Sequence, residues 1–351
     1  MEFKIKKGIS FKFTSLNLDT ISLQSSEVGI YPNDYPGLKL ELVVSLGDTV
    51  LIGSPILTDN KIVVTSPISG IVSNIVIGAR RKIVSIIISN DFKYLNANLK
   101  YSTFLDGLLV SGLFTSFKTR PFDKIARPHV LPSAIFVNAT DSYPYSVPAA
   151  KVVSENISFF LKGIEVIKKF QIPIKLILDP SLKNIEGGIH FHGKHPYGLI
   201  GTHLNLTYPV SLERRIWYIN YQDVVAIGKF FDGNYQYSRR IYALHGMGHH
   251  LIENDLGFNA HKLMPTSPNL ISGSFLYGLP LDNNQPFIHR FHLSINSISN
   301  FEGPKIFGWL TPGLKKFTVS NLFLSSFIKI APHLDTGLNG STRALFPMDI
   351  Y

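Results

Sequence analysis

The sequence predicts an α+β multidomain protein in which two small β domains flank a parallel α/β domain. Short alternating apolar runs punctuated by Gly, Pro and Asp fill residues 36–90, and similar runs return between 250 and 311. Between them, strand-like and helix-like segments alternate, an order that favours a parallel sheet. The predicted limits are 1–100 for the first β domain, 101–130 for a connector, 131–246 for the α/β domain, 250–311 for the second β domain and 312–351 for a short, truncated C-terminal segment.

The first β domain is predicted from apolar runs at 38–44, 62–65, 71–77 and 83–88. Glycines separate the runs where hairpins must turn sharply, a conformation that a Cβ penalises. Two similar hairpins packed face to face would form a small flattened barrel, and the pattern resembles the biotinyl/lipoyl carrier fold. Lys61 is the candidate for a carrier lysine, but it lacks the Met neighbours of a biotin site. We therefore expect a structural barrel, with a carrier as the alternative.

The α/β domain is predicted from apolar strands and amphipathic helices in alternation. The expected strands are 134–137, 175–178 and 240–244, and the expected helices are 149–170 and 221–231. The first helix places one apolar face at Val153, Ile157, Phe160, Ile164 and Ile167. Within the connector, 104–114 is expected to form one or two helical turns. These elements predict a Rossmann-like domain.

The second β domain is expected to contain strands at 270–274, 287–293 and 305–309, separated by turn residues. Beyond it, 314–351 holds one short amphipathic piece followed by a stretch rich in Gly, Asn and Thr. That composition predicts a short tail without a core of its own.

Composition excludes several classes of function. The chain has 351 residues and no Cys, which excludes disulfides, thiolate-held iron–sulfur clusters, Cys-type zinc sites and Cys nucleophiles. Its net charge is +10, but the basic residues come in scattered pairs, so we expect no nucleic-acid partner. A solvated surface or attraction to an anionic bilayer or acidic partner stays open. No apolar run of membrane-spanning length and no secretory signal occurs, so we expect a cytoplasmic protein.

Motifs for nucleotides and for nucleophilic catalysis are missing. The strand at 134–137 is followed by Asn-Ala-Thr-Asp-Ser instead of a Gly-rich phosphate loop, and neither a P-loop nor Gly-x-Ser-x-Gly occurs. The segment 187–203 is unusual because it carries four histidines among glycines. It is expected to be an irregular loop, and a metal site, a tight turn and a ligand- or partner-contacting loop all remain open. His245, His249 and His250 are expected in an exposed interdomain linker.

Six ordered segments point to a family. They are GLFTSFKTRPF at 112–122, HPYGLIGTH at 195–203, YQDVVAIGK at 221–229, ISGS at 271–274, FGWL at 307–310 and LNGSTR at 338–343. Together they resemble the A subunit of the sodium-translocating NADH:quinone reductases (Na+-NQR), and the match runs from residue 1 to 351. Family members continue past the last segment into a helical unit, so the resemblance implies that this chain lacks that unit.

The resemblance implies a peripheral subunit on the cytoplasmic face of the bacterial inner membrane. The six-subunit complex passes electrons from NADH through flavins and iron–sulfur centres on other subunits to ubiquinone, and exports sodium. The A subunit would carry no cofactor or metal and would contribute to ubiquinone binding. Its partners would be the other five subunits, especially the membrane subunit of the quinone site. The second β domain would be a β-grasp (SLBB-like) domain. A related flavoprotein binds FMN at the stretch comparable to 112–122.

The expected contacts with quinone or partners follow the two most specific segments. They are Phe114, Phe117, Arg120, His195, Pro196, Gly198, Gly201, Thr202 and His203. Catalytic, cofactor-binding and metal-ligating residues are not expected. The alternative is a stand-alone scaffold, either degenerate flavoprotein-like or carrier-like, with no membrane attachment.

Overall fold

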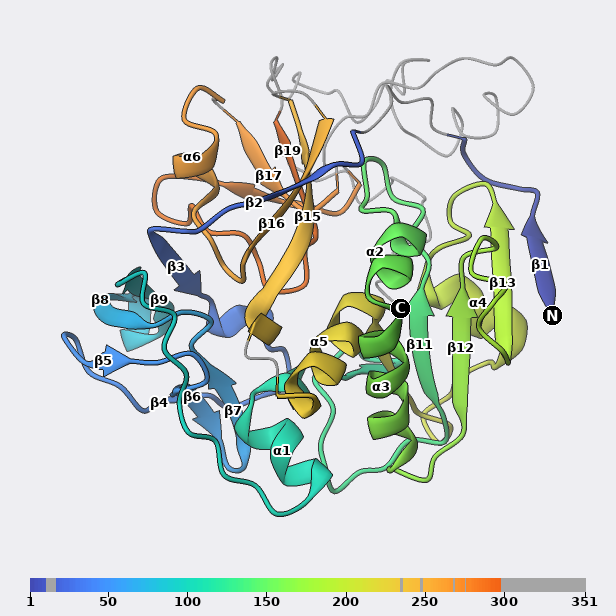
Figure 1. Ribbon diagram of the computed structural model, residues 1–351, viewed down its shortest axis with the longest axis horizontal. Helices are drawn as coiled ribbons and strands as arrows, with labels where there is room; N and C mark the ends of the chain where they lie inside the picture. Colours follow the sequence, from blue (N-terminus) through green and yellow to red (C-terminus); the bar gives the residue numbers. More distant parts are fainter. Residues whose placement is uncertain (11–16, 234–235, 247–248, 268, 275, 298–351) are drawn as a thin grey trace.

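In the part of the chain that the structure describes, four β-sheets form the framework (Figure 1). The computed structural model describes residues 1–10, 17–233, 236–246, 249–267, 269–274 and 276–297. Two small antiparallel sheets lie at one side, a six-stranded, mostly parallel sheet covered by helices lies at the other, and a mixed six-stranded sheet lies above the space between them (Figure 1). The protein is therefore a mixed α/β multidomain chain, in agreement with the predicted class.

The N-terminal barrel is built from two small antiparallel sheets. One contains β3 (Glu27–Ile30), β9 (Ile83–Asn90), β8 (Gly70–Ile77) and β5 (Thr49–Val50), and the other contains β4 (Glu41–Leu42), β6 (Pro55–Asp59) and β7 (Ile62–Thr65). Short 3-10 helices, η1 (Pro32–Asp34) and η2 (Ala79–Arg81), join strands of this unit. Val28, Ile56 and Val72 are wholly buried between the sheets. The alternating runs predicted this barrel because alternate side chains of each strand point into it.

The first two strands of the chain pair outside the barrel. β1 (Glu2–Ile5) lies parallel to β13 of the large parallel sheet, and β2 (Thr20–Ser22) lies parallel to β16 of the mixed sheet. The predicted limit 1–100 stays a prediction, but the strands before β3 do not contribute to the barrel. Local patterns could not reveal this, because both partners lie more than half the chain away.

The central sheet has the strand order β1-β13-β12-β11-β14-β10. Its further strands are β10 (Lys118–Arg120), β11 (Ile135–Ala139), β12 (Ile174–Leu178), β13 (Gly188–Gly193) and β14 (Ile216–Asn220). All neighbours pair in parallel except β10, which is antiparallel to β14. The predicted parallel α/β unit is confirmed.

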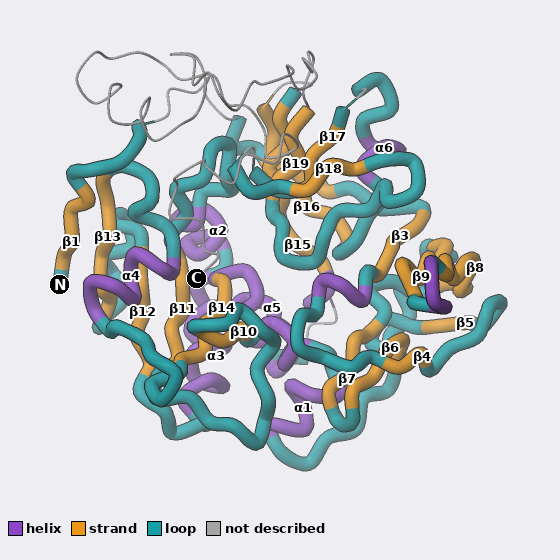
Figure 2. The backbone as a smooth tube through the Cα atoms, turned by 180° about the vertical axis from the view of Figure 1, so that it is seen from behind, coloured by secondary structure: helices purple, strands orange, loops and turns teal. Residues whose placement is uncertain are grey.

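Helices cover both faces of the central sheet (Figures 1 and 2). One face carries α2 (Ala149–Glu155), α3 (Ile157–Lys168) and α5 (Tyr221–Phe231), and the other carries α4 (Ile200–Thr207). The predicted single helix 149–170 is two helices, because Asn156 leaves helical geometry with φ −123° and ψ 32°. In the connector, α1 (Phe104–Val110) and η3 (Leu113–Ser116) are the expected helical turns.

The mixed sheet has the order β18-β17-β19-β15-β16-β2. Its further elements are η4 (Gln236–Ser238), β15 (Arg239–His245), β16 (His249–Asp255), α6 (Ala260–Leu263), β17 (Leu270–Ser272), β18 (Leu279–Leu281) and β19 (Ser294–Ser297). The strand at 240–244 was predicted for the α/β domain, but it pairs with β16 and β19 here. The run 287–293 is not a strand. The β-grasp topology stays a prediction, and 305–309 and 312–351 lie outside the described residues.

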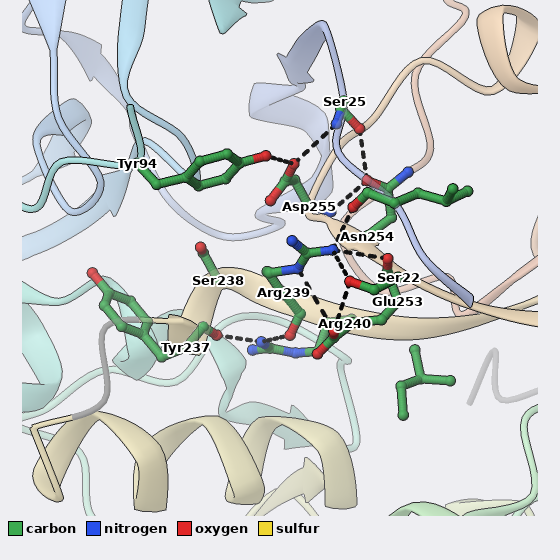
Figure 3. Close-up of polar contacts among 12 residues, drawn as sticks. Ser22, Ser25, Tyr94, Tyr237, Ser238, Arg239, Arg240, Glu253, Asn254 and Asp255 are labelled. Carbon is green, nitrogen blue, oxygen red and sulfur yellow. Dashed lines mark hydrogen bonds and ion pairs between the residues drawn. The ribbon is translucent and has the colours of Figure 1, made fainter. Parts of the chain in front are cut away.

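Polar contacts join the barrel to the mixed sheet (Figure 3). Asp255 Oδ2 at the end of β16 accepts hydrogen bonds from the Ser25 amide and the Tyr94 hydroxyl, both at 3.2 Å. Ser25 Oγ also donates to Asn254 Oδ1 at 2.8 Å. Burial raises the pKa of the Asp255 carboxyl above its usual value. The two units therefore meet through a buried, hydrogen-bonded polar junction.

Candidate functional site

The predicted contact residues lie at opposite edges of the central sheet. Strands β11 to β14 are parallel, so their carboxyl ends form one edge, the carboxyl edge, and their first residues form the amino edge. The segment 195–203 follows β13 and lies at the carboxyl edge. Antiparallel β10 ends opposite Ile216, the first residue of β14, so Arg120 lies at the amino edge. No single surface therefore contains both predicted groups.

At the carboxyl edge, His195 holds two loops together. It is 3% exposed, and its Nδ1 lies 2.9 Å from both Oγ and the carbonyl oxygen of Ser142, which follows β11. Burial lowers the pKa of His195 to about 4, so the ring is neutral at pH 7. Gly198 donates its N–H to the same Ser142 Oγ at 2.9 Å, and a Cβ on Gly198 would stand 2.4 Å from the Ser142 nitrogen. His195 and Gly198 thus shape the edge by close packing.

His203 has a similar structural role in α4. It is wholly buried, its Nε2 lies 2.7 Å from the Tyr197 carbonyl oxygen, and its ring lies 4.4 Å from that of Phe191. Burial lowers its pKa to about 4, so the ring is neutral at pH 7. Because a carbonyl oxygen can only accept, the single ring proton lies on Nε2, which donates to Tyr197. Of the remaining predicted residues, Gly201 is exposed, and Pro196 and Thr202 are half-buried.

The histidine-rich segment is more regular than predicted. The expected irregular loop 187–203 contains strand β13 and the start of α4, with a short loop between them. Within the described part of the chain, no three His, Asp or Glu side chains are grouped as metal ligands would be. The two most buried histidines of this segment instead stabilise main-chain turns.

Phe114 and Phe117 lie in the core instead of on a contact surface. Both are wholly buried, and the ring centroid of each lies 5.7 Å from that of Trp217. Phe117 also packs against Phe170 at 5.8 Å. Arg120 is 1% exposed, with its guanidinium 5.2 Å from the Tyr218 ring. These three residues therefore have almost no surface to offer a partner. The sequence did not predict their burial, because it follows from the packing of η3 and β10 against the central sheet.

An exposed apolar surface, which the sequence did not reveal, lies at the amino edge beside Arg120. Phe122 is 56% exposed at the turn after β10, Leu131 is 59% exposed before β11, and Leu212 is 64% exposed before β14. The Ser133 amide donates to the Arg215 carbonyl at 2.8 Å, and this bond joins the segment that leads into β11 to the segment that leads into β14. We call Phe122, Val130, Leu131 and Leu212, with the basic residues Lys124, Arg214 and Arg215, the amino-edge surface.

The basic residues of the amino-edge surface are exposed. The Lys124 ammonium lies 5.9 Å from the Phe122 ring, and the Arg214 guanidinium lies 5.4 Å from the Tyr208 ring. Within the described residues, neither these two side chains nor Arg215 forms an ion pair. Exposed apolar side chains with cations around them are typical of surfaces that bind a partner or a membrane. The sequence signal for it is an apolar residue beside a proline, as in Pro121-Phe122 and Leu131-Pro132.

His245, His249 and His250 do not form an interdomain linker. They lie on β15 and β16, where His245 pairs with His249 in the antiparallel register. Their Nδ1 atoms are 2.7 Å apart, and the Tyr145 ring stacks on His245 at 3.6 Å. Burial, together with His249, lowers the pKa of His245 to about 4. The prediction failed because a Gly-rich histidine segment looks the same in a hairpin and in a linker.

None of the described helices combines the length and the hydrophobicity needed to cross a lipid bilayer.

Comparison with known proteins identifies the family. Residues 3–91 match the NqrA N-terminal barrel-sandwich hybrid domain, and residues 99–235 match the NqrA second alpha/beta domain. The A subunits of the Na(+)-translocating NADH-quinone reductases of Klebsiella pneumoniae and Actinobacillus succinogenes are each 33% identical to this chain over 99% of its length, covering 85% and 84% of the relative. The corresponding protein of Rhodopirellula baltica is 31% identical with 99% and 84% coverage. The chain therefore belongs to the NqrA family, the A subunits of the Na(+)-translocating NADH-quinone reductases.

Proposed function

We propose that this chain is a peripheral subunit on the cytoplasmic face of a bacterial inner membrane, where it contributes to quinone binding and assembly of the reductase. The observation that carries the proposal is the similarity to NqrA proteins over 99% of the chain. Its partners are the other five subunits, and ubiquinone is the substrate of the complex. Nucleic acid has no part in this function.

The proposed subunit carries no redox cofactor of its own, and NADH, flavins and iron–sulfur centres bind to other subunits. Two observations support this. The chain contains no Cys to ligate an iron–sulfur cluster. Phe114 and Phe117 fill the segment comparable to a flavin-binding loop, and both are packed against Trp217. Bulky side chains there prevent the close backbone approach that a flavin phosphate requires.

The amino-edge surface is the part of the molecule that best supports contact with the membrane-embedded partner. Phe122, Leu131 and Leu212 offer apolar area that a membrane subunit, or the isoprenoid tail of a quinone bound to it, would cover. Arg214 and Arg215 would then face the anionic lipid headgroups of the cytoplasmic leaflet. The predicted contacts at the carboxyl edge are less suited, because His195 and His203 are buried.

Reconstitution tests the proposed function. Membranes that lack NqrA are supplied with this chain, and NADH:quinone reductase activity is measured with and without sodium. Recovery of sodium-stimulated activity supports the proposal, and a KM for a short-chain ubiquinone that depends on this chain supports the contribution to quinone binding.

A lack of recovery, with the protein left in the soluble fraction, would contradict the proposal and favour the stand-alone scaffold. Two controls distinguish versions of that alternative. A yellow protein would indicate a flavin, and a mass increase at Lys61 would indicate a carrier.

A further inference from the structure

We propose that a cavity where the barrel, the connector and the mixed sheet meet binds a small anion, either a halide or a one-carbon carboxylate. The cavity has a volume of about 50 Å³. Tyr35 enters it from the barrel side, Thr115 from the connector, and Arg240 and Arg290 from the mixed-sheet side. The proposal concerns this chain alone and does not depend on the proposed function.

The size of the cavity restricts the class of ligand. A single water needs about 10–15 Å³ measured in this way, so the cavity has room for more than one water. Drug-sized ligands and cofactors occupy pockets of about 300–1,000 Å³. A quinone ring or a nucleotide is therefore too large for the cavity as it stands, whereas chloride or formate is small enough.

Hydrogen-bond donors are in excess around the cavity. Arg240 and Arg290 share one oxygen, Asp223 Oδ1, with Nη2 distances of 2.8 and 2.9 Å. Two guanidinium groups that compete for a single carboxylate oxygen leave donors without an ionic acceptor.

The donors of Arg240 are almost all engaged. Its Nη1 donates to the carbonyl oxygens of Tyr237 and Arg239, and its Nε reaches Asp223 at 3.3 Å (Figure 3 shows the Tyr237 contact). Arg240 thus contributes mainly charge to the cavity, and the directional bonds to a ligand must come from elsewhere.

Arg290 supplies those bonds. Its Nη2 donates to Asp223 Oδ1 and, at 3.0 Å, to Ser116 Oγ. Its Nε and Nη1 groups have no acceptor among the residues that the structure describes. Tyr35, which also lines the cavity, is 7% exposed, and its hydroxyl likewise has no partner within the described residues. Burial raises the pKa of the Tyr35 phenol above its usual value, so the hydroxyl keeps its proton and can donate.

The carboxylate that lines the cavity, Asp34, is already engaged. Its Oδ1 lies 2.6 Å from His289 Nδ1, and its Oδ2 accepts the Arg290 backbone N–H at 2.8 Å. These contacts hold both carboxylate oxygens in place and partly offset their charge. The hydrogen-bond donors of Arg290 and Tyr35 that lack an acceptor therefore decide which kind of ligand the cavity favours. Such a donor set fits an acceptor-only anion, and it is poorly suited to a cation.

Thermal unfolding of the full chain in different sodium salts tests the proposal. Chloride, formate and gluconate are compared at one ionic strength and pH 7.5, with gluconate as the anion too large for the cavity. We expect chloride or formate to raise the Tm by about 3 °C or more above gluconate, with saturation, because a ligand stabilises the state it binds. The salt that acts shows whether a halide or a carboxylate is bound.

Two variants and a control locate the effect. Arg290→Gln should abolish the response, and Tyr35→Phe should raise the anion concentration for half the response about tenfold, through loss of one donor to a charged acceptor. Tyr208→Phe, outside the cavity, should respond like the unmodified chain. If Arg290→Gln does not fold, Tyr35→Phe decides alone. Equal Tm values in all three salts, or an unchanged half-response concentration in Tyr35→Phe, would overturn the proposal.

Discussion

Gly228 of α5 lies against the Phe159 carbonyl of α3 so closely that a Cβ on the glycine would stand 1.8 Å from that oxygen. The contact is reciprocal, because a Cβ on Gly163 of α3 would stand 2.1 Å from the Val224 carbonyl oxygen of α5. The two helices therefore approach backbone to backbone over the buried face of the central sheet.

This approach predicts that Gly228→Ala destabilises the protein strongly. The methyl group cannot be accommodated without moving a helix, so we expect a loss of about 3 kcal/mol in the free energy of unfolding, measured by urea denaturation. Gly187→Ala is the matched control, because nothing lies within 4 Å of a Cβ there and only its left-handed φ of +76° is penalised. The control should lose about 1 kcal/mol. Equal losses in the two variants would contradict the close helix contact.

The buried ion cluster of Asp223, Arg240 and Arg290 predicts a large loss in the free energy of unfolding for Asp223→Asn. Burial tends to raise the pKa of Asp223, but Arg290 and Arg240 outweigh it and hold the pKa below its usual value. Removing the charge leaves two buried guanidinium groups without their carboxylate and should cost about 3 kcal/mol. A depressed carboxyl pKa stabilises the fold above about pH 4 and loses that effect only as the pH falls through the folded value.

The Asp223→Asn penalty should therefore be the same at pH 8 and pH 5 in urea denaturation. Asp232→Asn serves as the control, since Asp232 pairs with Lys162 at the exposed surface and should leave the unfolding midpoint nearly unchanged. A penalty that disappears between pH 8 and pH 5 would mean that Asp223 takes up a proton in the folded protein between those two pH values, so that its pKa is raised instead of lowered.

His203 predicts loss of stability in mild acid. Burial lowers its folded pKa to about 4, whereas an unfolded histidine titrates near 6.5. Below pH 6.5 the unfolded chain gains a proton that the folded chain does not, so stability falls until the pH reaches about 4. This one group should lower the free energy of unfolding by about 2 kcal/mol between pH 7.5 and pH 5.

The variant His203→Gln checks this contribution, because an amide can still donate to the Tyr197 carbonyl but does not titrate. Its stability should depend less on pH than that of the unmodified chain, by the same amount. His129→Gln, at an exposed position, should keep the original dependence. An unchanged slope in His203→Gln would show that His203 titrates normally in the folded protein.

The amino-edge surface predicts weaker attachment when its apolar side chains become polar. The triple variant Phe122→Ser, Leu131→Ser and Leu212→Ser should lower the affinity for membranes that lack NqrA at least tenfold, measured by co-sedimentation, because each exposed side chain buries apolar area on binding. The control, Leu46→Ser with Ile71→Ser, changes exposed apolar residues of the barrel. A similar loss in the control would indicate a different contact surface.

Local periodicity predicted the elements whose burial depends on near neighbours. Val153, Phe160 and Ile167 were placed on one helix face, and all three are wholly buried. The hairpins of the barrel could also be predicted, because alternating apolar and polar residues show which side chains of a strand lie on each of its two faces. The partners of a strand could not be predicted. The apolar pattern of β15 would be the same in the central sheet as in the mixed sheet, where it is found.

The candidate site shows the same limit. Phe117 is wholly buried and Phe122 is 56% exposed, although both belong to one segment of the sequence. Their difference arises because β10 pairs with β14 and the chain then turns back on itself, with Phe122 in the turn between Thr119 and Lys124. The family resemblance identified the segment, but only the tertiary pairing decides which side chain reaches the surface.

The pairing of β1 with β13 has a consequence for how the chain can be divided. Phe3 stands opposite Phe191 in this ladder, with stacked rings 4.8 Å apart. A ribosome must complete residues 188–193 before the first strand finds its place, so that strand waits through most of the synthesis of the α/β unit. An excised fragment that begins after the barrel would leave β13 with unpaired N–H and C=O groups, and such an open edge recruits strands from other chains.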